Sequence, residues 1–219
     1  MLSRLAIASA ALLGLFAPAA IAAERDYLQP GEEKLTADYE IKYDHAVRYV
    51  LARGWQKDVV LRMFPVPAFQ PEFVSGIART ARGYTAFKAT VADNIWYQLG
   101  FGSEEWKQKY SNYRHIKPIV HERPLSDALA LRIAALWRRV LTDRRNYGKD
   151  ESVYVDTVQF RYYLGFAPHE RLNAHMVAWG PHTERLVETG SALASYASGA
   201  FSERELVKAV TQAERKLGI

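Results

Sequence analysis

The feature that most constrains this fold is an alternating stretch late in the chain. Apolar and polar side chains exchange at every position from 158 to 164, which is the period of a half-buried β-strand; the apolar positions are Val158, Phe160, Tyr162 and Leu164. Gly165 and Pro168 interrupt this strand, and residues 172–179 have a suitable length to return as its antiparallel partner. A Gly-Pro pair at 180–181 then opens a helical pattern. The sequence therefore predicts a strand–strand–helix unit.

The rest of the chain supplies further strands and helices. Apolar runs and alternation predict strands at 59–64, 84–91 and 116–121, and Pro118 confines the last to the edge of a sheet. Residues 73–81 are predicted to form a short helix that ends at Gly83. Longer helices are predicted to begin near Asp38, Ser126, Pro181 and Ser202. Hairpin-length links between these elements predict a single α+β domain, with a mainly antiparallel sheet and helices packed on one face.

The helix after Ser126 has the clearest apolar stripe. Its apolar residues recur at helical spacing and are Leu129, Ile133, Leu136, Trp137, Val140 and Leu141. We therefore expect Trp137 to be buried in the core. The last helix opens with a Ser-Glu-Arg-Glu sequence at 202–205, which is a capping box.

The N-terminus has the pattern of a secretory signal peptide. Arg4 provides a positive charge, residues 5–16 form an apolar run, and small residues at Ala20 and Ala22 suit signal peptidase. The alternative is a membrane anchor, but the run is shorter than the ~20 apolar residues that span a bilayer. We expect residues 1–22 to be removed and residues 23–219 to form the domain, periplasmic or secreted, with no stable membrane insertion after cleavage.

Composition narrows the chemistry. The 29 Lys and Arg residues exceed the 24 Asp and Glu residues, for a formal net charge of +5. These basic residues are scattered along the chain, so we do not expect a nucleic-acid partner. The chain has no Cys, which excludes disulfides, thiol catalysis and Cys-ligated metals.

No catalytic or metal-binding motif is found. The chain has neither a Gly-x-Ser-x-Gly elbow nor a phosphate-binding Gly-rich loop. His121-Glu122 lacks the second His of a zinc-protease helix, and His169, His175 and His182 follow no metal-ligand spacing. We read these residues as polar surface histidines and expect no catalytic residue, metal site or cofactor.

Asp156 is the one carboxylate that leaves a catalytic alternative open. It precedes the alternating strand and has the same parity as its apolar positions. The simpler interpretation is a turn-forming Asp at the start of the strand. The alternative is an envelope hydrolase that uses Asp156 with a nearby His, and a deep pocket shared by Asp156, Arg161 and His175 would favour it.

Aromatic and basic residues alternate between positions 96 and 114. Such a stretch can stack on sugars or contact a protein partner, or its rings can pack on the sheet. Positions 106, 110 and 113 fall on one side if the segment is helical. A second candidate surface lies where the strand at 172–179 ends beside a helix N-terminus. The candidate binding residues are Trp106, Tyr110, Tyr113, Arg114, Trp179 and His182.

Residues 129–196 also follow a recognisable order: a helix with a central Trp, an aromatic strand that starts at an Asp, a strand that ends near a Pro, and a helix with Arg-Leu-Val. The matching residues are Trp137, Arg145, Tyr147, Asp156, Phe160, Tyr162, Trp179, Pro181, Arg185, Leu186 and Val187. This order resembles a family of small uncharacterised secreted proteins of Gram-negative bacteria. Thr157, in place of a Gly, and His182, in place of a small residue, depart from it. The resemblance implies an exported α+β protein and no particular activity.

These observations together predict a non-catalytic binding or interaction module of the cell envelope, such as an immunity or inhibitor protein. Its expected partner is another protein of the envelope.

Overall fold

The computed structural model describes residues 27–31, 34–66, 70–99, 113–143, 158–178 and 180–219. The described residues form a seven-stranded sheet in which every neighbouring pair is antiparallel. Its strands, in spatial order, are β1 (Tyr27–Pro30), β7 (Leu172–Ala178), β6 (Gln159–Leu164), β2 (Val59–Val66), β3 (Phe73–Thr80), β4 (Gly83–Thr90) and β5 (Ile119–Leu125). The predicted α+β class with an antiparallel sheet is confirmed.

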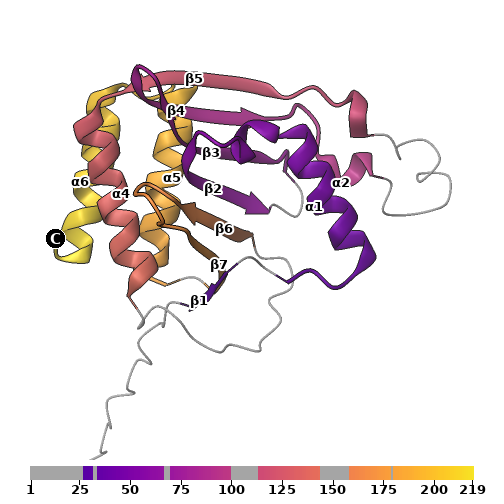
Figure 1. Cartoon of the computed structure of the whole chain (residues 1–219), viewed down its shortest axis with the longest axis horizontal. Coiled ribbons are helices and arrows are strands. Elements are labelled where there is room, and N and C mark those ends of the chain that lie inside the picture. Colours follow the sequence, from indigo (N-terminus) through magenta and orange to yellow (C-terminus); the bar gives the residue numbers. More distant parts are fainter. Residues whose placement is uncertain (1–26, 32–33, 67–69, 100–112, 144–157, 179) are drawn as a thin grey trace, which may run out of the picture.

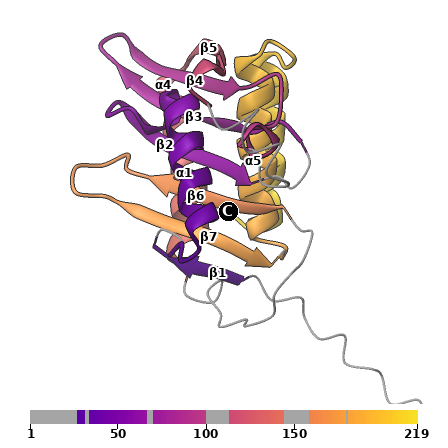
Figure 2. The ribbon, with the colours of Figure 1, turned by 90° about the vertical axis from the view of Figure 1, so that its right-hand side faces the viewer.

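Helices cover both faces of this sheet (Figures 1 and 2). One face, which we call the α5 face, carries α4 (Asp127–Thr142), α5 (Thr183–Ala197) and α6 (Glu203–Leu217). The opposite face, the α1 face, carries α1 (Asp38–Val50) and the short elements η1 (Ala52–Trp55), α2 (Ile95–Gln98) and η2 (Tyr113–His115). The prediction that helices pack on one face thus holds for the three C-terminal helices, whereas α1 packs on the other.

The core on the α5 face is large and apolar. Trp137 of α4 is fully buried, as predicted, and its Nε1 donates a hydrogen bond to Thr189 Oγ1 of α5 at 2.8 Å. Its ring meets the ring of Tyr162 on β6 edge to face, with centroids 5.5 Å apart. Gly190 lets α5 approach the sheet, because a Cβ there would lie 2.4 Å from the Met63 sulfur. These contacts bind the C-terminal helices to the central strands.

The core on the α1 face is smaller and contains a buried acid. Apolar residues of α1 pack on the faces of β2, β3 and β4, chiefly Ala46, Val47, Val50, Phe64, Val74 and Phe87. Glu72, which is fully buried, accepts hydrogen bonds from Tyr43 Oη at 2.9 Å and from the backbone N–H groups of Ile95 and Trp96 at 2.6 and 3.2 Å. This carboxylate joins α1 to the start of α2. Burial raises its pKa.

The prediction of a short helix at 73–81 is wrong, because this segment is β3, an interior strand of the sheet. The sheet has a core on each face, so Val74 and Ala78 are buried under α1 while Ile77 is buried under α5. A strand buried on both sides shows no alternation of polar and apolar residues. Gly83, expected to end that helix, instead lies in the β3–β4 hairpin with φ +112°.

Other predictions are confirmed. The strand predicted at 116–121 is β5, shifted to 119–125, and it forms one edge of the described sheet. Pro118, from which the edge position was predicted, lies just before the strand, and the proline within β5 is Pro124. The strands at 158–164 and 172–179 are β6 and β7, and they pair with each other. The capping box of α6 is present, since the Glu205 side chain accepts from the Ser202 N–H at 2.7 Å.

Candidate functional site

Polar side chains gather where α1 leaves the α1 face open. The α1 helix covers β2, β3 and β4, whereas the strands on the other side of β2 expose polar residues on that face. Side chains alternate between faces, so residues that pair across neighbouring strands share a face. One such row is Phe64, Arg161, His175 and Gln29, and the next is Arg62, Tyr163 and Asn173.

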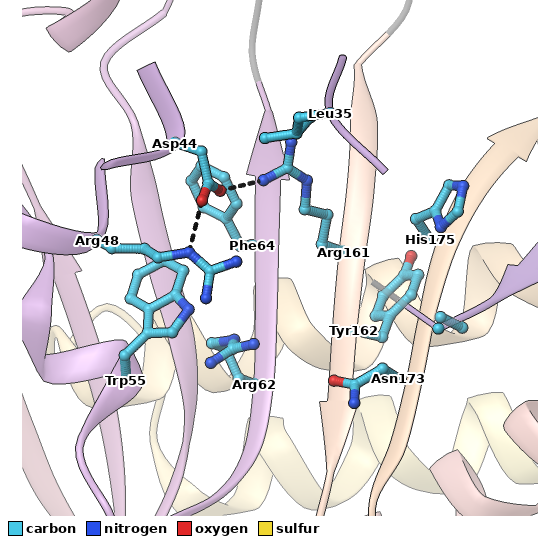
Figure 3. Close-up of a pocket in the computed structure, with 12 residues that line it drawn as sticks. Leu35, Asp44, Arg48, Trp55, Arg62, Phe64, Arg161, Tyr162, Asn173 and His175 are labelled. Carbon is cyan, nitrogen blue, oxygen red and sulfur yellow. Dashed lines mark hydrogen bonds and ion pairs between the residues drawn. The ribbon is translucent and has the colours of Figure 1, made fainter. Parts of the chain in front are cut away.

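A pocket lies over these rows, between the sheet and α1 (Figure 3). Its described lining includes three arginines from three different elements: Arg48 of α1, Arg62 of β2 and Arg161 of β6. Asp44 is the one acidic residue in that described lining. The volume of this pocket is about 30 Å³, enough for a small group rather than a whole drug-sized ligand. We call this site the arginine pocket.

Asp44 holds two of the three arginines (Figure 3). One carboxylate oxygen accepts from Arg48 Nε at 2.7 Å, and the other accepts from Arg161 Nη1 at 2.6 Å. The first contact joins residues four apart on one helix, while the second ties α1 to the sheet. The side chains of Asp44 and Arg161 are 14% and 17% exposed, so water weakens this pair less than it weakens a surface ion pair.

Arg62 is fixed between aromatic rings. Its guanidinium carbon lies 4.6 Å from the centroid of Trp55 and 5.3 Å from that of Tyr163, which are cation–π distances. Its Nη1 also donates to the carbonyl of Gly54 at 3.1 Å. A glycine is needed there, because a Cβ on residue 54 would lie 2.6 Å from a methyl group of Val74. The tight η1 turn therefore positions both a ring and an acceptor for Arg62.

The far wall of the pocket is neutral and polar. Asn173 and His175 line it from β7, and His175 Nε2 donates to Gln29 Oε1 of β1 at 2.9 Å. On the near wall, the indole Nε1 of Trp55 is buried, and no described residue accepts a hydrogen bond from it. The described pocket thus offers guanidinium, amide and indole N–H donors and a single carboxylate.

This arrangement can bind an anionic group. Guanidinium groups form charge-assisted, bidentate hydrogen bonds with carboxylates and phosphates, and their fork geometry suits planar or tetrahedral oxyanions. The strands and α1 hold these arginines before any ligand arrives, so little side-chain entropy is lost on binding. Within the described segments, no group of three or more His, Asp or Glu residues is placed to hold a metal ion.

The residues singled out from the sequence lie elsewhere or outside the described residues. Tyr113 and Arg114 lie in η2, where the Tyr113 hydroxyl is 2.8 Å from His45 Nδ1 and its ring meets Tyr49 of α1. His182 is the N-cap residue of α5. Trp106, Tyr110, Trp179 and Asp156 lie outside the described residues. The structure therefore brings none of the described candidates into the arginine pocket.

Sequence reasoning named Arg161 and His175 in the hydrolase alternative, and the structure places both in the arginine pocket. It missed Asp44, Arg48, Trp55 and Arg62. A local signal existed for two of them, since Asp44 and Arg48 are an acid–base pair at i, i+4. The contact between Asp44 of α1 and Arg161 of β6 joins residues 117 apart in the sequence, and such a contact leaves no local signal along the chain.

Comparison with protein-family models, with curated proteins and with solved structures finds no match to this chain. None of the helices in the described parts of the chain is both long and apolar enough to cross a membrane.

Proposed function

We propose that this chain is an exported, non-catalytic binding module, such as an immunity or inhibitor protein, and that the arginine pocket binds an anionic group of its partner. The observation that carries the proposal is the convergence of Arg48, Arg62 and Arg161 from α1, β2 and β6 on one small pocket. The ligand group that this pocket suits is an oxyanion, either a carboxylate or a phosphate. Export and the envelope protein partner rest on the N-terminal pattern and belong to the proposal.

The geometry of the donors is what supports binding. Three guanidinium groups reach one small pocket from three different elements, and guanidinium groups form charge-assisted hydrogen bonds with oxyanions. An incoming anion therefore meets hydrogen-bond donors that the fold already orients.

The hydrolase alternative receives partial support from the same geometry. Arg161 and His175, two of the three residues named for the hydrolase, both line the pocket. However, no Ser, Thr or Cys nucleophile is among the described residues that line the pocket, and the His175 Nε2 proton is already donated to Gln29. Turnover of simple phosphate and carboxylate esters, abolished by Asp156→Asn, would favour the enzyme over the binder.

The test is calorimetric titration with inorganic phosphate and with acetate at low ionic strength. Arg161→Gln removes a donor and should weaken binding by about tenfold or more, because hydrogen bonds to charged groups contribute about 1.5–3 kcal/mol. Asp44→Asn removes the competing negative charge and should strengthen binding, even though it weakens the fold. A purely structural network would give no binding in any variant.

Arg132→Gln is the matched control. Arg132 is also an ion-paired arginine, but it lies on α4 and pairs with Glu214 of α6, on the other face of the sheet. Its substitution should leave anion affinity unchanged. If it weakens binding as much as Arg161→Gln does, the anion responds to the overall charge and the pocket is not the site.

A further inference from the structure

The two edges of the described sheet differ in how open they are. β1 is four residues long and ends at Pro30, whereas β5 is seven residues long. β5 pairs with β4 on its inner side, and no described strand pairs with its outer side (Figure 1). An open edge is a template for another strand, and proteins usually shield it.

The position of Pro124 shows which backbone groups of β5 point outward. Proline has no N–H to give to β4, so its backbone must face away from the ladder. The carbonyl of Pro124 accepts instead from Tyr196 Oη at 2.6 Å. Because the direction of backbone groups repeats every second residue, Val120 and Glu122 also direct their N–H and C=O groups outward. These four groups can form a ladder with an added strand.

Apolar side chains beside this edge are exposed. Ile119 and Val120 are 47% and 44% exposed, and Tyr49 at the end of α1 is 52% exposed. Val120 pairs with Ala89 and so lies on the α1 face, next to a groove of about 430 Å³ between β5 and the end of α1. The groove is lined by Tyr49, Val50, Ala52, Arg53, Gln56, Arg114, Ile116, Pro118 and Val120. It offers room for side chains of an added strand.

The charges around the edge are mainly basic. Arg114 lines the groove on the α1 face beside Arg53, whose guanidinium is ion-paired with both Glu122 and Asp58. On the α5 face, His121 pairs with Lys88 of β4. Glu122 is the one acid within β5, and Arg53 Nε already holds it at 2.5 Å. An added strand places its side chains alternately on these two faces, so acidic residues meet basic neighbours on either side.

We propose that the outer edge of β5 and the adjoining groove bind an extended acidic segment of a partner protein, which adds a strand to the sheet. This inference rests on the proposed function, because it gives the binding module a way to dock on its protein partner. It lies across β3 and β4 from the arginine pocket, so the two sites can fail independently. In strand addition, main-chain hydrogen bonds give affinity and alternate side chains give specificity.

The probe for the test is a short blocked peptide in which valine and glutamate alternate, titrated into the full chain at low ionic strength. Fluorescence anisotropy should show saturable binding below about 1 mM, and the matched valine–lysine peptide should bind at least about tenfold more weakly. Amide exchange at Val120 and Glu122 should slow when the acidic peptide is bound. No saturation by the acidic peptide overturns the proposal.

Val120→Pro removes one outward donor and leaves the β4 ladder intact, as Pro124 already does. It should weaken peptide binding by about tenfold, whereas the control Val120→Thr keeps the N–H and should bind normally. If Val120→Pro does not fold, a peptide with N-methyl groups on the amides of one edge gives the same test with the unchanged protein. Equal affinity for the N-methylated and parent peptides overturns the proposal.

Two further measurements separate the outcomes. Arg161→Gln should leave peptide affinity unchanged, because Arg161 does not lie at the β5 edge. Loss of phosphate binding in that variant therefore tests the proposed function separately from peptide binding. Light scattering of the chain alone should give a monomer mass. A dimer that Val120→Pro dissociates would show that a second copy of this chain covers β5 and would overturn the proposal of an acidic partner.

Discussion

The two faces of the sheet are formed by the same strands but carry different kinds of side chains. On the α5 face, three long helices bury apolar side chains such as Trp137, Ile133 and Leu186. On the α1 face, α1 covers part of the sheet and leaves arginines and amides over β6 and β7. Burial of apolar area is the main source of stability. The α5 face therefore carries most of the fold's stability, and the α1 face carries charged groups that cost energy to bury.

This difference between the two faces supports the proposed anion site on the α1 face. Buried guanidinium groups do not stabilise a fold as well as apolar residues of the same size. Arg161 reaches Asp44 on another element instead of packing into a core. A chain that has a sufficient core on one face can keep such a cluster on the other, which is why we propose the α1 face as the binding face.

The largest expected effect is on the α5 face. Trp137→Ala removes a fully buried ring and its hydrogen bond to Thr189, and should lower the free energy of unfolding by ~3–5 kcal/mol. Denaturant unfolding measures this. Leu131→Ala, on the same helix but 55% exposed, is the control and should change stability little. Equal midpoints for the two variants would contradict the proposed role of the α5 face.

On the α1 face, Asp44→Asn should have a smaller effect. The substitution breaks the ion pair with Arg161 and leaves that guanidinium with less charge compensation. We expect a loss of about 2 kcal/mol, below the value for a fully buried pair because both side chains retain some exposure to water. Chemical denaturation at neutral pH measures it. A loss as large as that of Trp137→Ala would make the α1 face equally important for stability.

The buried acid of the α1 face makes stability depend on pH. Burial raises the pKa of Glu72 above its ordinary value of 4.5, so the folded state binds this proton more tightly than the unfolded state does. The stability that Glu72 contributes to the folded state is complete below pH 4.5 and is lost as the pH rises through the folded-state pKa. The wild type should therefore lose stability relative to Glu72→Gln as the pH rises above 4.5.

Glu205→Gln gives the opposite sign in the same experiment. Hydrogen bonds from Ser202 lower the pKa of the Glu205 carboxyl, so its contribution is present above the unfolded-state pKa and is lost as the pH falls. Thermal denaturation across the pH range measures both variants. Parallel pH profiles for wild type and Glu72→Gln would show that Glu72 titrates normally in the folded protein.

The smallest expected effect concerns the exposed rim of the α1 face. Tyr113→Phe removes the hydroxyl that lies 2.8 Å from His45 Nδ1 and leaves the ring on Tyr49. An exposed hydrogen bond contributes little net energy, so the free energy of unfolding should change by about 0.5 kcal/mol. Urea denaturation measures the change. A larger loss would show that η2 is a structural anchor for α1.

The sequence predicts the α5 face better than the α1 face. Periodicity identifies α4 and β6 because each of them has one apolar side. The same pattern places Trp137 in the core. Periodicity fails for β3, which is buried on both sides. It also leaves the arginine pocket unidentified, since Asp44, Arg62 and Arg161 come together only when α1 crosses the sheet. Contacts between distant elements leave no local pattern.

The most direct test of anion binding on the α1 face is a nuclear magnetic resonance titration with inorganic phosphate. We predict saturable shifts of the Nε–H signals of Arg48, Arg62 and Arg161, together with the backbone amides of β6 and β7 beside them. The Nε–H signal of Arg132, on the α5 face, should not move. Shifts that do not saturate, or that spread equally over the arginines of both faces, would contradict the account.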